Sequence, residues 1–230
     1  MNTVVQENTK DQKNHEDLLK HLVIQSKNDL LNLEKKNCFL QQIFQKNKFD
    51  QILKPNLLKA DYWIKIFYIL QERTKKNIKQ PVLIYQGTRD GLNNQQYWKK
   101  VNGKENLLMV FKSKSDYIFG AYSPCKWESC NGKYIEDNTL SSFIFSQTHD
   151  QVYPLKQDQK QYAIYCYSGN GPRFGQGYDI YIQGDFNDGN SRLGCSYQFN
   201  QYKGGNDDPY LFGQNKPEIK ECEIYELQFV

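Results

Sequence analysis

The sequence predicts an α+β fold: a sandwich of two antiparallel β-sheets with flanking short helices, preceded by an N-terminal helical extension. Up to about residue 70, apolar residues recur at spacings of three and four, as in amphipathic helices. After Pro81 the pattern changes to short β-branched and aromatic runs separated by glycine-rich turns. These runs do not alternate with long helical segments, which favours antiparallel sheets over βα units. We expect a polar tail and amphipathic extension over residues 1–49, and a domain over residues 50–230.

The extension is expected to form an amphipathic helix after a short polar tail. Asn14 is suited to cap the helix, and Asp17 places a negative charge in its first turn. Leucines and other apolar residues follow at helical spacing over residues 18–44. Asp29 and Lys36 interrupt the heptad pattern, so docking onto the domain or a partner is favoured over a coiled coil.

Two more helices are expected before Pro81. Asp50 can cap a short helical stretch that runs to Leu53, and Pro55 suits the first turn of the next helix. That helix is expected to be well buried, because its apolar face is broad. The residues of this face are Leu58, Tyr62, Trp63, Ile66, Phe67, Ile69 and Leu70.

The rest of the chain reads as strands and turns. We expect a strand over Val82–Tyr85, a turn over Gly87–Gly91, and a short helix over Asn93–Lys100 with Tyr97 and Trp98 facing inward. The later strands are expected over residues 107–112, 117–122, 142–146, 162–167, 179–183 and 222–229.

A glycine-rich stretch, Gly171–Ile180, raises the question of phosphate binding. Glycine-rich phosphate loops lead into a helix, whereas this one leads into a β-branched and aromatic run. We therefore expect a conformationally demanding turn between two antiparallel strands, in which Gly171, Gly175 and Gly177 allow a tight crossing. Asp179 is expected to tie this crossing by accepting backbone N–H bonds.

The sequence contains no convincing catalytic constellation, and we expect neither a cofactor nor a metal. The three histidines do not neighbour a nucleophile motif. Cys125 and Cys130 have four residues between them in a polar loop, where a redox role is favoured over zinc because a second ligand pair is missing.

Two charged segments have alternative interpretations. Arg89-Asp90 is expected to form a local turn with an ion pair. Glu221, Glu223 and Glu226 nearly follow the strand period, which indicates a solvated strand face; an acidic patch for a cation or a basic partner is the alternative.

The composition argues against two classes of protein. The net charge is only +4 over 230 residues, which gives little basis for binding a nucleic acid. No apolar run approaches the length that spans a membrane, and residues 1–8 lack the apolar stretch of a signal peptide. We therefore expect a cytoplasmic protein whose six cysteines are thiols.

Six segments in order resemble the TLDc domain, also called the TLD domain of oxidation-resistance proteins. They are Tyr85–Gly91, Tyr117–Tyr122 with Trp127, Ser142–Ser146, Gly171–Ile180, Leu193–Tyr197 and Glu221–Tyr225. The resemblance implies a two-sheet sandwich, a link to oxidative-stress resistance and, in several members, binding to the cytosolic sector of the vacuolar-type proton ATPase (V-ATPase). The family-motif residues that are candidates for structural or interaction roles are Arg89, Asp90, Gly91, Gly120, Trp127, Gly171, Pro172, Gly175, Gly177, Asp179, Glu221 and Glu223.

We therefore expect a non-enzymatic protein-interaction module, with V-ATPase subunits as the leading partner and the N-terminal helix as a docking element. It would lie in the cytoplasm, at the periphery of an organelle membrane or in cilia. One alternative is a scaffold subunit of a cytoskeletal or ciliary assembly, and another is a redox or hydrolytic enzyme.

Overall fold

The computed structural model describes residues 25–27, 56–199 and 210–230. Residues 25–27 are helical. The rest of the expected N-terminal extension lies outside the described residues, as do Asp50, Leu53 and Pro55. In the part that the structure describes, no helix is long and apolar enough to cross a bilayer.

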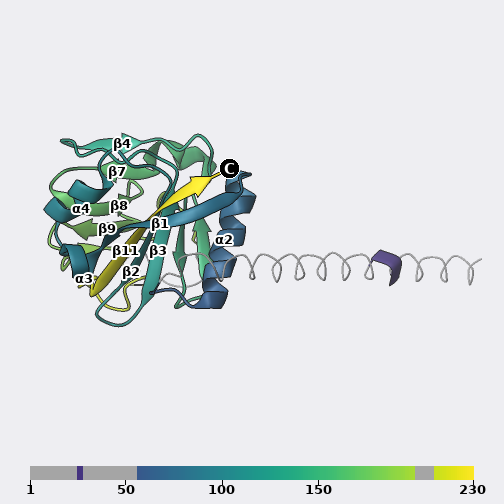
Figure 1. Ribbon diagram of the computed structural model, residues 1–230, viewed down its shortest axis with the longest axis horizontal. Coiled ribbons are helices and arrows are strands. Elements are labelled where there is room, and N and C mark those ends of the chain that lie inside the picture. Colours follow the sequence, from purple (N-terminus) through teal and green to yellow (C-terminus); the bar gives the residue numbers. More distant parts are fainter. Residues whose placement is uncertain (1–24, 28–55, 200–209) are drawn as a thin grey trace, which may run out of the picture. The chain divides into compact units, whose positions relative to one another are not determined.

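Two antiparallel sheets form the sandwich that the sequence predicts (Figure 1). The six-stranded sheet has, in spatial order, β1 (Ile78–Gln86), β11 (Glu221–Phe229), β2 (Leu107–Lys112), β3 (Ile118–Ser123), β5 (Phe143–Ser146) and β6 (Gln151–Pro154). The five-stranded sheet has β10 (Gly189–Asn190), β9 (Ile180–Gln183), β8 (Asn170–Phe174), β7 (Ile164–Cys166) and β4 (Lys133–Ile135). The last strand of the chain, β11, therefore lies between β1 and β2.

The six-stranded sheet is buried on both faces. In β2, Leu107, Met109 and Phe111 belong to the core between the two sheets. Leu108 and Val110 are also fully buried but point to the opposite face, because successive side chains of a strand alternate. Burial of both faces explains why this strand is a continuous apolar run rather than an alternating one.

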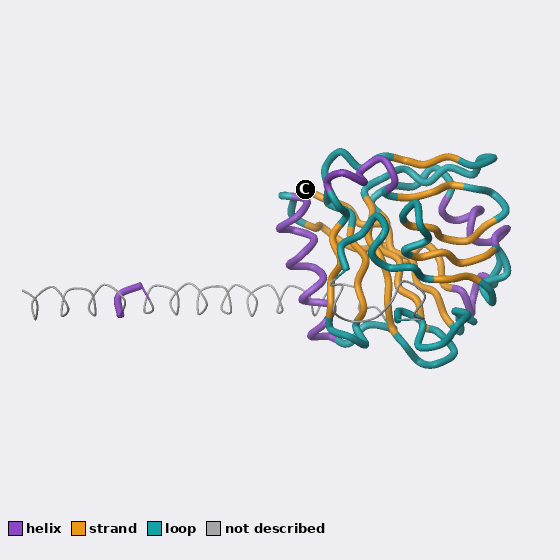
Figure 2. The backbone as a smooth tube through the Cα atoms, turned by 180° about the vertical axis from the view of Figure 1, so that it is seen from behind, coloured by secondary structure: helices purple, strands orange, loops and turns teal. Residues whose placement is uncertain are grey.

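Helix α2 (Ala60–Thr74) covers the second face, on the side away from the five-stranded sheet (Figures 1 and 2). The Trp63 ring lies 6.0 Å from that of Tyr225 on β11. The helix begins at Ala60, later than the expected start at Pro55. Residues 56–58 form bends instead, and the Leu57 N–H donates to the buried Glu223 carboxylate at 3.3 Å. The Glu223 carboxylate thus accepts the Leu57 N–H, which would have had no partner in the first turn of a helix.

Short helices flank the sandwich. Their bounds are α3 (Gly87–Asp90), α4 (Asn94–Val101) and the 3₁₀ helix η1 (Gln157–Tyr162). The expected turn at Gly87–Gly91 is thus a single helical turn. The prediction for α4 is confirmed: the Asn93 side chain accepts the Gln96 N–H at 3.0 Å, and Tyr97 and Trp98 are buried.

Strands β4, β6, β8 and β10 were not predicted. They are only two to five residues long and carry many polar residues, so their sequence pattern is weak. The strand expected from residue 162 begins at Ile164, because η1 occupies the preceding residues. Pro81 lies inside β1, which is an edge strand. Proline has no N–H, and an edge strand tolerates this because its outer side has no neighbouring strand to bond.

We predict that Trp63→Ala lowers the free energy of unfolding by about 3–5 kcal/mol, because it leaves a large cavity between α2 and the sheet. Tyr68→Ala is the matched control on the same helix, where the side chain is 43% exposed, and it should cost about 1 kcal/mol or less. Chemical denaturation measures both values. Equal losses would contradict the packing of α2 described above.

Candidate functional site

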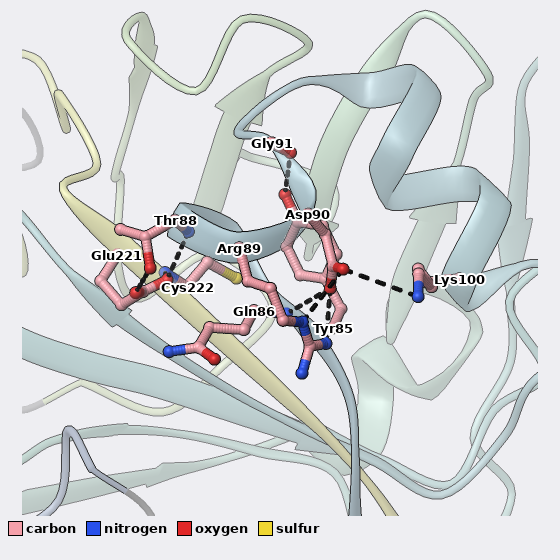
Figure 3. Close-up of polar contacts among 9 residues, drawn as sticks. All are labelled: Tyr85, Gln86, Thr88, Arg89, Asp90, Gly91, Lys100, Glu221 and Cys222. Carbon is pink, nitrogen blue, oxygen red and sulfur yellow. Dashed lines mark hydrogen bonds and ion pairs between the residues drawn. The ribbon is translucent and has the colours of Figure 1, made fainter.

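The motif around Arg89 and Asp90 forms a hydrogen-bonded turn at the end of β1 (Figure 3). Arg89 Nη2 lies 2.7 Å from Asp90 Oδ2, which also accepts the Gln86 N–H at 2.9 Å. Lys100 Nζ approaches Asp90 Oδ1 at 3.6 Å. The Arg89 hydrogen bond, the Gln86 N–H and both positive charges lower the pKa of Asp90 to about 2.

Glu221 joins this turn to the last strand. Its carboxylate accepts the Thr88 N–H at 3.1 Å and the Thr88 hydroxyl, and it also accepts the N–H of Cys222 at 2.8 Å (Figure 3). Tyr85 Oη completes the turn by donating to the Gly91 carbonyl at 2.8 Å. The first and last motifs of the series are therefore held together by a side chain at the start of β11.

Glu223 is fully buried, so the expected solvated strand face is wrong at this position. Its Oε2 accepts the Tyr225 hydroxyl at 2.9 Å, in addition to the Leu57 N–H. Its Oε1 has no hydrogen-bond partner among the described residues. The segment before α2 covers this face of β11, which the strand period alone cannot reveal.

The three glutamates do not form the alternative acidic patch. Glu226 pairs with Lys104 at 2.8 Å, while Glu221 and Glu223 are engaged as above. Across the described ranges, no three His, Cys, Asp or Glu side chains gather where they could hold a metal ion.

The glycine-rich stretch is a hairpin. Gly171 and Pro172 lie in β8 rather than in a loop, and the turn that follows leads into the antiparallel strand β9. Gly175 has φ of 78°, and a side chain there would overlap the Asp179 carboxylate. At Gly177 a side chain would overlap Cys195.

Asp179 binds the segment that follows β10. It is fully buried, and its carboxylate accepts four backbone N–H groups. The donors and distances are Gly194 at 2.9 Å, Cys195 at 3.0 Å, Ser196 at 2.8 Å and Tyr197 at 3.2 Å. Asp179 thus accepts backbone N–H bonds, as expected, but from residues 194–197 and not from its own turn. Burial raises its pKa to about 6, against the opposing effect of these four N–H groups.

Two other motif residues have packing roles. Trp127 is fully buried between the sheets, with its ring 5.4 Å from Phe174 and 6.4 Å from Tyr97. Gly120 lies in β3, where a Cβ would overlap the Phe145 ring and the Met109 carbonyl of the neighbouring strand. Only glycine therefore fits at position 120.

Two of the described cysteines, Cys125 and Cys166, are poorly placed for thiolate chemistry. Cys125 is buried rather than exposed in a loop, and burial raises its pKa to about 12. Burial likewise raises the pKa of Cys166 to about 11. The expectation of an exposed thiolate at Cys125 is therefore wrong. His149 stacks on Tyr210 at 3.9 Å, while His15 and His21 lie outside the described residues.

Sequence reasoning missed one cluster. Arg173 of β8 lies among four tyrosine rings on the face of the five-stranded sheet opposite the core. The distances from Cζ to the ring centroids are 4.2 Å for Tyr165, 4.3 Å for Tyr178, 5.6 Å for Tyr134 and 5.8 Å for Tyr181. The signal in the sequence is a tyrosine or arginine at the outward position of β4, β7, β8 and β9, but β4 and β8 were not predicted. Tyr178 lies in the turn before β9.

We predict that Asp179→Ala lowers the free energy of unfolding by about 3 kcal/mol or more, because four backbone N–H groups, two of them buried, lose their acceptor. Asp185→Ala is the matched control. Asp185 accepts the N–H groups of Asn187 and Asp188, but it is exposed and water can replace it. Thermal melting compares the two variants, and similar shifts would contradict this role of Asp179.

We predict a pH-dependent effect of Asp90→Asn. The pKa of Asp90 is lowered in the folded protein, so the ionised carboxylate stabilises the fold above about pH 4, and this contribution disappears as the pH falls towards 2. At pH 6 the variant should be less stable than the wild type, because Asn cannot pair with Arg89. The loss should be only about 1 kcal/mol, because solvent screens the exposed Arg89. Chemical denaturation of the wild type and the variant at pH 6 and at pH 2 measures the difference in their free energies of unfolding. The same difference at both pH values would contradict the mechanism.

The TLDc domain family matches residues 52–228, which include every described strand except the last residue of β11. No curated protein gives a significant match to the chain. The match covers most of the sequence and agrees with the two-sheet sandwich and with the ordered motifs whose contacts are described above. This chain therefore belongs to the TLDc domain family.

Proposed function

We propose that this chain is a non-enzymatic protein-interaction module linked to resistance to oxidative stress. The observation that carries the proposal is the use of the motif side chains. The Asp179 carboxylate accepts hydrogen bonds from four backbone N–H groups, and the Glu221 carboxylate accepts them from backbone N–H groups of α3 and β11. These groups fix loops of the fold, and a residue that fixes a loop in this way is poorly suited to act on a substrate.

The chemistry of the remaining groups supports the same proposal. A nucleophilic thiol needs a thiolate near neutral pH, yet burial raises the pKa of both Cys125 and Cys166. Binding through the surface of the sandwich requires none of these groups.

The partner that we propose is the cytosolic catalytic sector of the V-ATPase. Support comes from the TLDc family, in which several members bind this sector, and from the match over residues 52–228. The N-terminal extension, residues 1–49, would add a docking element, and the protein would act in the cytoplasm beside the pump.

We predict that the tagged full-length chain captures V-ATPase subunits from a cell lysate, as measured by mass spectrometry. A TLDc protein that binds the pump is the positive control, and a tag alone is the negative control. Removal of residues 1–49 should weaken the capture if the extension contributes to docking. Recovery of pump subunits by the positive control but not by this chain would remove the V-ATPase as partner.

We also predict that Cys125→Ala with Cys130→Ala leaves the protection of cells against peroxide unchanged, because the module acts by binding. Alanine is used because it removes the sulfur without placing a polar hydroxyl at the buried position 125. Survival after peroxide, at equal protein level and melting temperature, is the measurement. Loss of protection with an unaltered fold would support direct thiol chemistry instead.

A further inference from the structure

The cluster around Arg173 forms a continuous outward face of the five-stranded sheet. We define the tyrosine–arginine surface as Arg173 of β8 together with Tyr134, Tyr165, Tyr178 and Tyr181. Strand pairing brings these residues side by side: Tyr134 is the partner of Tyr165, and Arg173 is the partner of Tyr181. Strand pairing therefore builds most of the surface, and the turn before β9 adds Tyr178.

Alternation explains why these side chains face outward. Ile164, Phe174 and Ile180 are fully buried in the core between the sheets. Their neighbours in sequence, Tyr165, Arg173 and Tyr181, point to the other face and are only half-buried. In contrast to the six-stranded sheet, whose second face carries α2, this face keeps large aromatic side chains in partial contact with solvent.

Within the described ranges, the Arg173 guanidinium has no counter-charge. Among the described residues it forms no ion pair, whereas Arg89 is paired with Asp90. Its Nη2 donates to the Tyr134 hydroxyl at 2.9 Å and lies 3.5 Å from the Gln176 carbonyl, while its buried Nε has no partner among the described residues. Ring contacts hold the planar group in place but leave N–H donors unused.

We propose that the tyrosine–arginine surface binds an acidic segment of a protein partner, whose Asp or Glu carboxylate pairs with Arg173. Tyrosine and arginine are the residue types that dominate the energetics of protein interfaces, because they combine a large rigid contact area with polar groups. A guanidinium held by rings is already ordered, so pairing with a carboxylate costs little side-chain entropy. The inference rests on the proposed function and names its binding surface.

The single charge of the cluster favours a carboxylate. In the part of the chain that is described, Arg173 is the only cation seated over these four rings. One guanidinium balances one carboxylate through two parallel N–H bonds. A phosphate carries nearly two negative charges and is recognised by clusters of cations, and an anionic membrane surface requires several as well.

The test uses the full chain and an immobilised library of 12-residue random peptides. We expect the selected peptides to share an Asp or Glu. Arg173→Gln should weaken their binding by about tenfold or more, because it removes a desolvated charge pair. Lys99→Gln is the matched control, since it removes one exposed positive charge on α4 and should change binding less than about twofold.

A second measurement does not depend on the folding of the variant. In the selected peptide, the acidic residue is changed to its amide and the affinity for the wild-type chain is measured. The loss should match that caused by Arg173→Gln, and the two changes together should cost no more than either one alone. Additive losses would overturn the pairing, as would peptides that bind Arg173→Gln as tightly as the wild type.

Other outcomes separate this inference from the proposed function. Failure to select acidic peptides overturns the inference, even if the wild-type chain captures V-ATPase subunits. Capture of those subunits equally well by Arg173→Gln overturns it in the same way and leaves the proposed function standing. Acidic peptides that depend on Arg173, without any capture of the pump, support the surface and remove the pump as partner. Arg173-dependent binding only to phosphorylated peptides or to phosphatidylserine vesicles would overturn the carboxylate assignment.

Discussion

The structure depends on the pairing of β11 between β1 and β2. This strand is the last in the chain, and its neighbours on the two sides lie more than 100 residues earlier. It completes a sheet that is buried on both faces, with Ile224 towards the core between the sheets and Tyr225 towards α2. The apolar surface that both layers bury is the main source of stability for such a sheet. Both pairings of β11 are therefore non-local, so this part of the sheet depends on contacts between segments that are far apart in the sequence.

The same strand carries two motif glutamates that bind distant segments of the chain. Glu221 at its start binds the turn after β1, and Glu223 two residues later binds the segment before α2. Asp179 plays a comparable part at the other sheet, where one carboxylate fixes the backbone of residues 194–197. Buried carboxylates are costly unless hydrogen bonds compensate their desolvation, and backbone N–H groups supply that compensation here. These motif carboxylates are thus anchors of loops.

The two outer surfaces differ in character. Helix α2 occupies that of the six-stranded sheet through an aromatic layer that includes Trp63 and Phe67. The five-stranded sheet presents tyrosines around a guanidinium that has no acidic partner in the described part of the chain. An aromatic layer beneath a helix serves stability, whereas an aromatic layer that carries an uncompensated charge at the surface is suited to recognition.

The sequence by itself determined the family, the sandwich class, the positions of the longer strands and the capped helix α4. These features follow from local patterns, namely the apolar period and the glycine turns. It could not reveal that Glu223 is buried, that Asp179 binds residues 194–197, or that Arg173 lies among four tyrosine rings. Each of these depends on which distant segments become neighbours, and side chains of the same type and spacing would be solvated in another topology. Only the tertiary structure decided them, because strand pairing and the docking of α2 set the surroundings of each charged group.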